Sequence, residues 1–152
     1  MLKYTLALAA LISVNALAAA PDAKLDAQMT KWLSCQQPDF NTAIKAVNAY
    51  KAFGLVRNKP VSKLTKPIVI FGERINEVTL SYDQHDGSIA WSYLSTKKPQ
   101  DLAKLMKLGV ESYTPEGTND VEYRDFNHNQ SITLLTRNKG TEVSCQYDMG
   151  MF

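Results

Sequence analysis

Residues 78–93 read VTLSYDQHDGSIAWSY, and they are the most informative part of the chain for its architecture. Apolar residues alternate with small polar ones on both sides of the polar tetrapeptide 84–87. A period of two is expected for strands that bury one face. The tetrapeptide ends in Asp86-Gly87, a dipeptide that is common in tight turns between antiparallel strands. We therefore predict a β-hairpin whose second strand carries Trp91 and Tyr93 on one face.

Further strand patterns lie on both sides of this hairpin. Residues 67–71 are mostly apolar and are followed by Gly72, which we interpret as a turn or a bulge. After residue 120 the alternation returns in three segments, 121–126, 132–136 and 143–147, which polar turns separate. Clear alternation favours a mostly antiparallel sheet of about five strands with one face in water.

Helical periodicity appears in three places. An apolar stripe between Leu25 and Leu33 follows a candidate N-cap at Asp22, and a second stripe runs over residues 40–53. Their tight connection predicts an N-terminal helical hairpin. A short third helix is expected between the strands, over residues 99–109. The predicted fold class is therefore α+β, with the helices covering one face of the sheet.

The first residues have the features of a cleavable secretory signal. Lys3 precedes an uncharged stretch rich in Leu and Ala, and Ala16-Leu17-Ala18 fits the small-x-small rule for cleavage. We expect residues 1–18 to be removed. An uncleaved anchor is the alternative, but the stretch is shorter than the roughly 20 residues that a spanning helix needs. Residues 19–152 are then expected to form a single soluble domain without a membrane anchor.

Two cysteines, Cys35 and Cys145, follow the signal. In an oxidising compartment a lone pair this far apart indicates a structural disulfide, which would join the first helix to the last strand. Redox catalysis is the alternative, although the chain has no C-x-x-C motif. Signal and disulfide together predict a periplasmic or secreted protein.

Charge is nearly balanced but unevenly distributed. Without Lys3 the chain keeps 16 Lys and Arg, one fewer than the full sequence, against 15 Asp and Glu. This balance does not favour a nucleic-acid-binding protein, which must neutralise many phosphates. No acidic residue lies between Asp39 and Glu73, and we expect an exposed basic loop over residues 57–66. Ordinary solvation explains such a run, and a binding surface is the other explanation.

Motifs for catalysis or ligand binding are not found in the sequence. His85 and His128 fall in expected turns and lack the spacing of metal ligands, so no metal site is predicted. Glu73 and Glu77 can be nominated as paired carboxylates for glycoside hydrolysis, but their spacing is not specific. Phosphate-binding glycine loops and the G-x-S-x-G motif do not occur. The sequence calls for no cofactor and favours a protein without enzymatic activity.

A small exported domain of this kind is most economically a protein-binding module. Its partner would be another exported or envelope protein, and the module would be an inhibitor, an immunity factor or an accessory protein. Two alternatives remain: a carrier of a small apolar or anionic ligand between sheet and helices, and a small hydrolase. Exposed cations steer association, and aromatic side chains favour protein contacts. The candidate contact residues are accordingly Arg57, Lys59, Lys63 and Lys66 first, and Trp91 and Tyr93 second.

Overall fold

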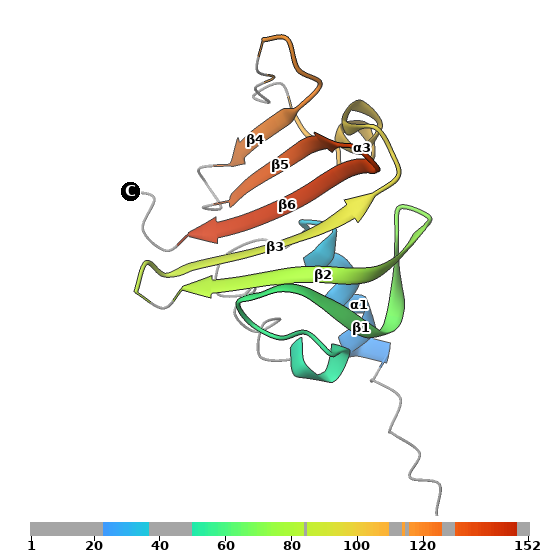
Figure 1. The fold of residues 1–152 in the computed structure, drawn as a ribbon, viewed down its shortest axis with the longest axis vertical. Helices are drawn as coiled ribbons and strands as arrows, with labels where there is room; N and C mark the ends of the chain where they lie inside the picture. Colours follow the sequence, from blue (N-terminus) through green and yellow to red (C-terminus); the bar gives the residue numbers. More distant parts are fainter. Residues whose placement is uncertain are drawn as a thin grey trace, which may run out of the picture.

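A computed structural model of the chain describes residues 23–36, 50–83, 85–109, 114, 116–125 and 130–148. These residues form a six-stranded antiparallel sheet with two α-helices and one 3₁₀ turn (Figure 1). The helices are α1 (Ala23–Leu33) and α3 (Pro99–Leu105), and the 3₁₀ turn η1 is Tyr50–Phe53. The strands are β1 (Lys59–Ile70), β2 (Glu73–Asp83), β3 (Ser88–Ser95), β4 (Val121–Asp125), β5 (Gln130–Arg137) and β6 (Gly140–Asp148). The predicted signal segment lies outside the described residues.

The sheet consists of two three-stranded meanders that meet at its centre. Its strand order is β1-β2-β3-β6-β5-β4, so β3 and β6 join the two meanders. These two strands pair from Ser88 opposite Asp148 to Ser95 opposite Thr141. Helix α3 leads from the centre of the sheet to its far edge at β4, because it follows β3 in the chain. The two meanders therefore form one continuous sheet.

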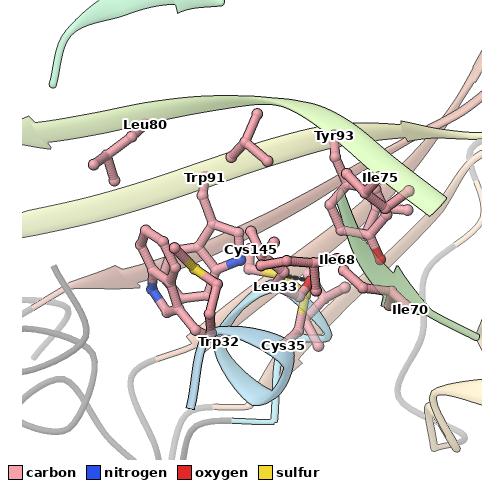
Figure 2. Close-up of a cluster of buried hydrophobic side chains, with 14 of the residues drawn as sticks. Trp32, Leu33, Cys35, Ile68, Ile70, Ile75, Leu80, Trp91, Tyr93 and Cys145 are labelled. Atoms are coloured by element: carbon pink, nitrogen blue, oxygen red, sulfur yellow. Dashed lines mark hydrogen bonds between the residues drawn. A yellow bond between two sulfur atoms is a disulfide. The ribbon is translucent and has the colours of Figure 1, made fainter. Parts of the chain in front are cut away.

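Both helices lie on the same side of the sheet, behind it in the view of Figure 1. Helix α1 contacts β1 and β3, and α3 contacts β4 and β5. Between α1 and the sheet, the Trp32 and Trp91 rings are 4.7 Å apart (Figure 2). Trp91 also stacks on Tyr147, with the ring centroids 5.3 Å apart. All three side chains are almost completely buried. Large aromatic side chains stabilise a core through buried area and ring contacts, so this cluster fixes α1 on the sheet.

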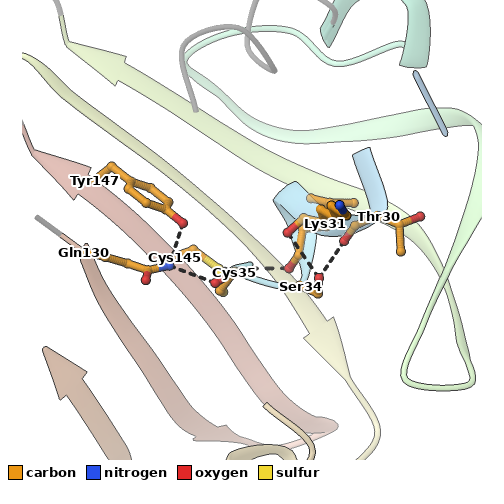
Figure 3. The surroundings of a disulfide bond; sticks show 8 residues. Thr30, Lys31, Ser34, Cys35, Gln130, Cys145 and Tyr147 are labelled. Carbon is orange, nitrogen blue, oxygen red and sulfur yellow. Dashed lines mark hydrogen bonds between the residues drawn. A yellow bond between two sulfur atoms is a disulfide. The ribbon is translucent and has the colours of Figure 1, made fainter. Parts of the chain in front are cut away.

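The predicted disulfide between Cys35 and Cys145 is confirmed, with the two Cα atoms 5.7 Å apart. It links the residues that follow α1 to the centre of β6. Gln130 supports it, because its Nε2 donates hydrogen bonds to the Cys35 carbonyl at 2.9 Å and to the Tyr147 hydroxyl at 2.6 Å (Figure 3). Gln130 and both cysteines are buried, so these polar groups satisfy one another away from water.

The hairpin of residues 78–93 and the inserted helix are confirmed as β2 with β3 and as α3. The predicted number of about five strands is wrong, since the sheet has six, and the basic segment is not the predicted loop. It forms most of β1, a strand at the edge of the sheet. Among residues 59–67 only Ser62 is buried, so no apolar alternation marks the strand. Pro60 and Pro67 lie where the pairing with β2 is irregular, and edge strands and bulges tolerate proline.

The expected N-terminal helical hairpin is not found in the described residues. Residues 37–49, which would form most of its second helix, lie outside the part that the structure describes. The last residues of the predicted stripe form the 3₁₀ turn η1, whose Phe53 is buried. Gly54 follows with a φ of 79°, and a Cβ atom there would lie 2.8 Å from the Lys63 carbonyl oxygen. The 3₁₀ turn therefore ends before Gly54, and the chain packs against β1 at this glycine.

None of the helices in the described ranges has the length and apolar character that crossing a membrane requires.

Candidate functional site

Trp91 and Tyr93 do not form an exposed surface. They are 1% and 4% exposed, because they point from β3 toward α1 into the core (Figure 2). Burial raises the pKa of Tyr93 well above its ordinary value, and the nearby Glu73 carboxylate adds to the effect. A period of two shows which residues share a face, but it does not show which face is wet. Neither side chain is exposed enough to form a contact surface by itself, although Tyr93 lines a pocket on the sheet together with Val61 and Leu94.

The basic residues of the predicted surface differ in their surroundings. Lys59 and Lys63 are exposed on β1. The Arg57 guanidinium lies over the ring of Tyr82, 5.3 Å from its centroid. Lys66 forms an ion pair with Asp26 of α1, and both side chains are about a third exposed. Lys66 therefore contributes to the attachment of α1, whereas Arg57, Lys59 and Lys63 face the solvent.

The face of the sheet opposite the helices is covered by small polar side chains. Thr79, Ser92, Ser144 and Thr133 lie directly opposite one another on β2, β3, β6 and β5. They alternate with the buried residues of these strands, so they point away from α1 and α3. We call this side of the sheet the open face. In the described part of the chain, both α-helices lie on the other side (Figure 1).

A pocket of about 500 Å³ interrupts the open face near its β1 edge, and we call it the sheet-face pocket. Val61 of β1 and Leu94 of β3 contribute apolar side chains to it, and each is 47% exposed. Glu77 and Lys139 also line it, and Lys63 lies opposite Glu77 in the register of β1 and β2. Val61 and Leu94 are therefore apolar side chains that face the solvent with charged residues around them.

A second pocket, of about 520 Å³, lies beside the first at the end of the sheet, and we call it the polar pocket. Arg137 lines both pockets, and its Nε and Nη2 atoms each donate to Glu142 Oε2 at 2.7 Å. Gly140 has a φ of 141°, and a Cβ atom there would overlap the Ser95 carbonyl. The start of β6 therefore packs closely against the end of β3. The other lining residues are Thr96, Lys97, Lys98, Pro99, Gln100, Asn119, Thr136 and Thr141.

Glu73, nominated as half of a carboxylate pair, has a structural role instead. It accepts hydrogen bonds from the hydroxyls of Ser95 and Thr96 and from the Thr96 amide, the last at 2.8 Å. Burial alone would raise its pKa, but these hydrogen bonds and the nearby Lys97 hold the pKa below the ordinary value. A carboxylate stabilised in its charged form is a poor general acid. Glu73 thus ties β2 to the end of β3.

The histidines form no site in the described residues. His85 is exposed in the turn between β2 and β3, where its backbone amide donates to Asp83 Oδ1 at 2.8 Å. His128 lies outside the described residues. Within the described ranges, no three His, Cys, Asp or Glu side chains come close enough together to hold a metal ion.

The pocket residues Val61, Leu94, Arg137 and Lys139 were not predicted as site residues. The sequence indicated one of these residues. Leu94 follows Tyr93 directly, so it is an apolar residue at a position where the alternation of the strand otherwise places a polar one. Such a residue is expected on the wet face. The nearness of Arg137 to Val61 was not predictable, because it depends on the pairing of β3 with β6.

The chain matches no protein-family model, and no curated protein or solved structure matches it.

Proposed function

We propose that this chain is an exported protein-binding module that works in the periplasm or outside the cell, and that its contact surface is the open face around the sheet-face pocket. The observation that carries this proposal is the exposure of Val61 and Leu94 in a pocket that charged residues surround. Protein interfaces combine an apolar centre with a polar rim. Small hydroxyl side chains on the neighbouring strands would let a partner approach the sheet closely.

A ligand held between sheet and helices finds less support. The space between α1 and the centre of the sheet is filled by Trp32, Trp91 and Tyr147, each at most 1% exposed. The two pockets described above open on the surface of the sheet and at its end instead. A protein partner on the open face is therefore the function that the geometry supports best.

Export is supported by the features of residues 1–18 and by a disulfide that closes 110 residues of sequence. Oxidising compartments are where such bonds persist. Intact-mass measurement of protein recovered from its native host tests this part of the proposal. The expected mass is that of residues 19–152 with both cysteines oxidised. An intact leader or two free thiols would contradict it.

Two leucines of nearly equal exposure provide a matched test of the contact surface. Leu94 is 47% exposed in the sheet-face pocket, and Leu105 is 45% exposed on α3. We expect Leu94→Asp to abolish the capture of a partner from the native envelope fraction and Leu105→Asp to leave it unchanged. Thermal unfolding of both variants serves as the folding control. Equal capture by both would refute the proposed surface.

A further inference from the structure

The linings of the two pockets carry more cations than carboxylates. Their cations are Lys97, Lys98, Arg137 and Lys139, and their carboxylates are Glu77 and Glu142. Arg137 and Glu142 form an ion pair, so Lys97, Lys98 and Lys139 remain against Glu77 alone. Glu73, which lies near Lys97, is outside both linings.

These cations are shared between the linings of the two pockets. Lys139 lines the sheet-face pocket together with Val61 and Leu94, and Lys97 and Lys98 line the polar pocket. Arg137 belongs to both linings, so the two pockets adjoin. A segment that crosses Arg137 would meet apolar side chains in one pocket and ammonium groups in both.

We propose that the adjoining pockets bind an acidic segment of another protein, which seats an apolar side chain between Val61 and Leu94 and directs its carboxylates at Lys97, Lys98 and Lys139. This inference rests on the protein-binding function proposed above and specifies the chemistry of the partner. Complementary charge gives such a contact its specificity and its association rate, and the apolar side chain supplies buried area.

The apolar component distinguishes this surface from a site for a free anion or a nucleic acid. A phosphate backbone would use the lysines but leave Val61 and Leu94 without a partner. A basic segment would meet unpaired ammonium groups, which is unfavourable where water is excluded. A chain that carries both carboxylates and an apolar side chain uses the three lysines together with Val61 and Leu94.

Selection from a displayed library of random peptides, with the mature disulfide-bonded protein as bait, tests the inference. We expect enriched peptides to carry a large apolar residue flanked by Asp or Glu. A synthetic peptide of the enriched sequence should lose affinity at least about tenfold with Leu94→Asp, since this change buries a charge in the contact. The control is Leu105→Asp, which should bind as the unmodified protein does.

A matched lysine set tests the charged part. Neutralising Lys97, Lys98 and Lys139 to Gln should weaken the same peptide by about tenfold at low salt and flatten the salt dependence. Neutralising Lys31, Lys104 and Lys107 removes three exposed charges outside both pockets and should change neither.

Three results would overturn the inference: enriched peptides that are basic or uncharged, equal losses in the two lysine sets, or no enrichment over the Leu94→Asp bait. None of these removes the broader proposal, which is tested separately by the capture of the native partner with Leu94→Asp and Leu105→Asp. The two failures are therefore distinguishable.

Discussion

Cys35 combines two roles at one position. It follows α1 with a φ of 59°, where its amide donates to the Trp32 carbonyl at 3.1 Å and the Gln36 amide donates to the Lys31 carbonyl at 2.9 Å. This hydrogen-bond pattern ends many helices, and glycine usually occupies the left-handed position. A cysteine there costs about 1–2 kcal/mol of backbone strain, which the disulfide to Cys145 offsets.

The left-handed backbone at residue 35 predicts the relative stability of two variants that both lack the disulfide. Cys35→Gly with Cys145→Ala should be more stable than Cys35→Ala with Cys145→Ala by about 0.5–1 kcal/mol, because glycine relieves the left-handed strain but costs more backbone entropy. Urea unfolding of the two double variants measures the difference. If the alanine variant is equally stable or more stable, the left-handed position of residue 35 carries no strain.

Glu73 predicts a pH dependence of stability at the acid end. Its folded-state pKa is lowered, so its hydrogen bonds to Ser95 and Thr96 stabilise the fold above the ordinary pKa of 4.5 and are lost as the pH falls through the folded value. Glu73→Gln should cost about 1 kcal/mol at neutral pH, a modest value because the carboxylate is partly exposed. The difference from the unmodified protein should shrink toward zero in strong acid.

Urea unfolding of both proteins from pH 7 down to pH 2 tests this prediction. Glu77→Gln is the matched control, since Glu77 is exposed on the same strand and is expected to leave stability nearly unchanged at every pH. A constant difference between Glu73→Gln and the unmodified protein across the range would contradict the role given to the carboxylate.

Among the elements, the sequence predicted those strand segments that bury one face and missed the first part of β1, which does not. The alternation in β2, β3, β5 and β6 follows the contact of one face with the core. The first half of β1 has no such contact, because it is an edge strand, and its two prolines are typical of loops. Strand identity there depends on pairing with β2, which is tertiary information.

Residues 59–66 form a strand and not the expected loop, and this changes the role expected for the cations of this segment. Arg57, Lys59 and Lys63 project from a fixed strand and its preceding turn instead of a loop, and Lys63 adjoins the sheet-face pocket through Glu77. Changing these three residues to Gln should slow association with an acidic partner severalfold at low salt, with little change at high salt. Lys66 is left unchanged because it pairs with Asp26.

Stopped-flow association with the captured partner, at two salt concentrations, measures this effect. The triple change Lys31→Gln, Lys104→Gln and Lys107→Gln has the same effect on net charge away from β1. Equal slowing by both sets would show that only net charge matters, and the strand would then have no special part in steering.

In the molecule as a whole, the disulfide and the aromatic cluster attach helix α1 to the sheet. The two central strands of this sheet, β3 and β6, are far apart in the sequence. The loop that the disulfide closes spans 110 residues, and a closure of this size contributes about 3–5 kcal/mol. Cys35→Ala with Cys145→Ala should therefore lower the free energy of unfolding by about that amount. Urea unfolding measures it, and a loss below about 1 kcal/mol would show that the core suffices alone.

The fold class, the disulfide and the inserted helix were predictable, because they follow from periodicity, turn residues and cysteine number. The candidate site was not, since Val61, Leu94 and Arg137 belong to different strands that meet only through the order β1-β2-β3-β6-β5. Trp91 and Tyr93 share one face of β3, as their spacing predicted, but the spacing does not show that this face is the buried one. The alternation shows that one face of each strand is apolar, but the packing of the helices determines which side chains on that face are buried.

We expect the open face around Leu94 to contact another exported protein. Site-specific photocrosslinking in the native host can detect this contact, with the photoreactive residue placed at position 94 or, as the control, at position 105. A discrete crosslinked protein is expected from position 94 and none from position 105. No crosslink from position 94, or the same crosslinks from both positions, would contradict this expectation.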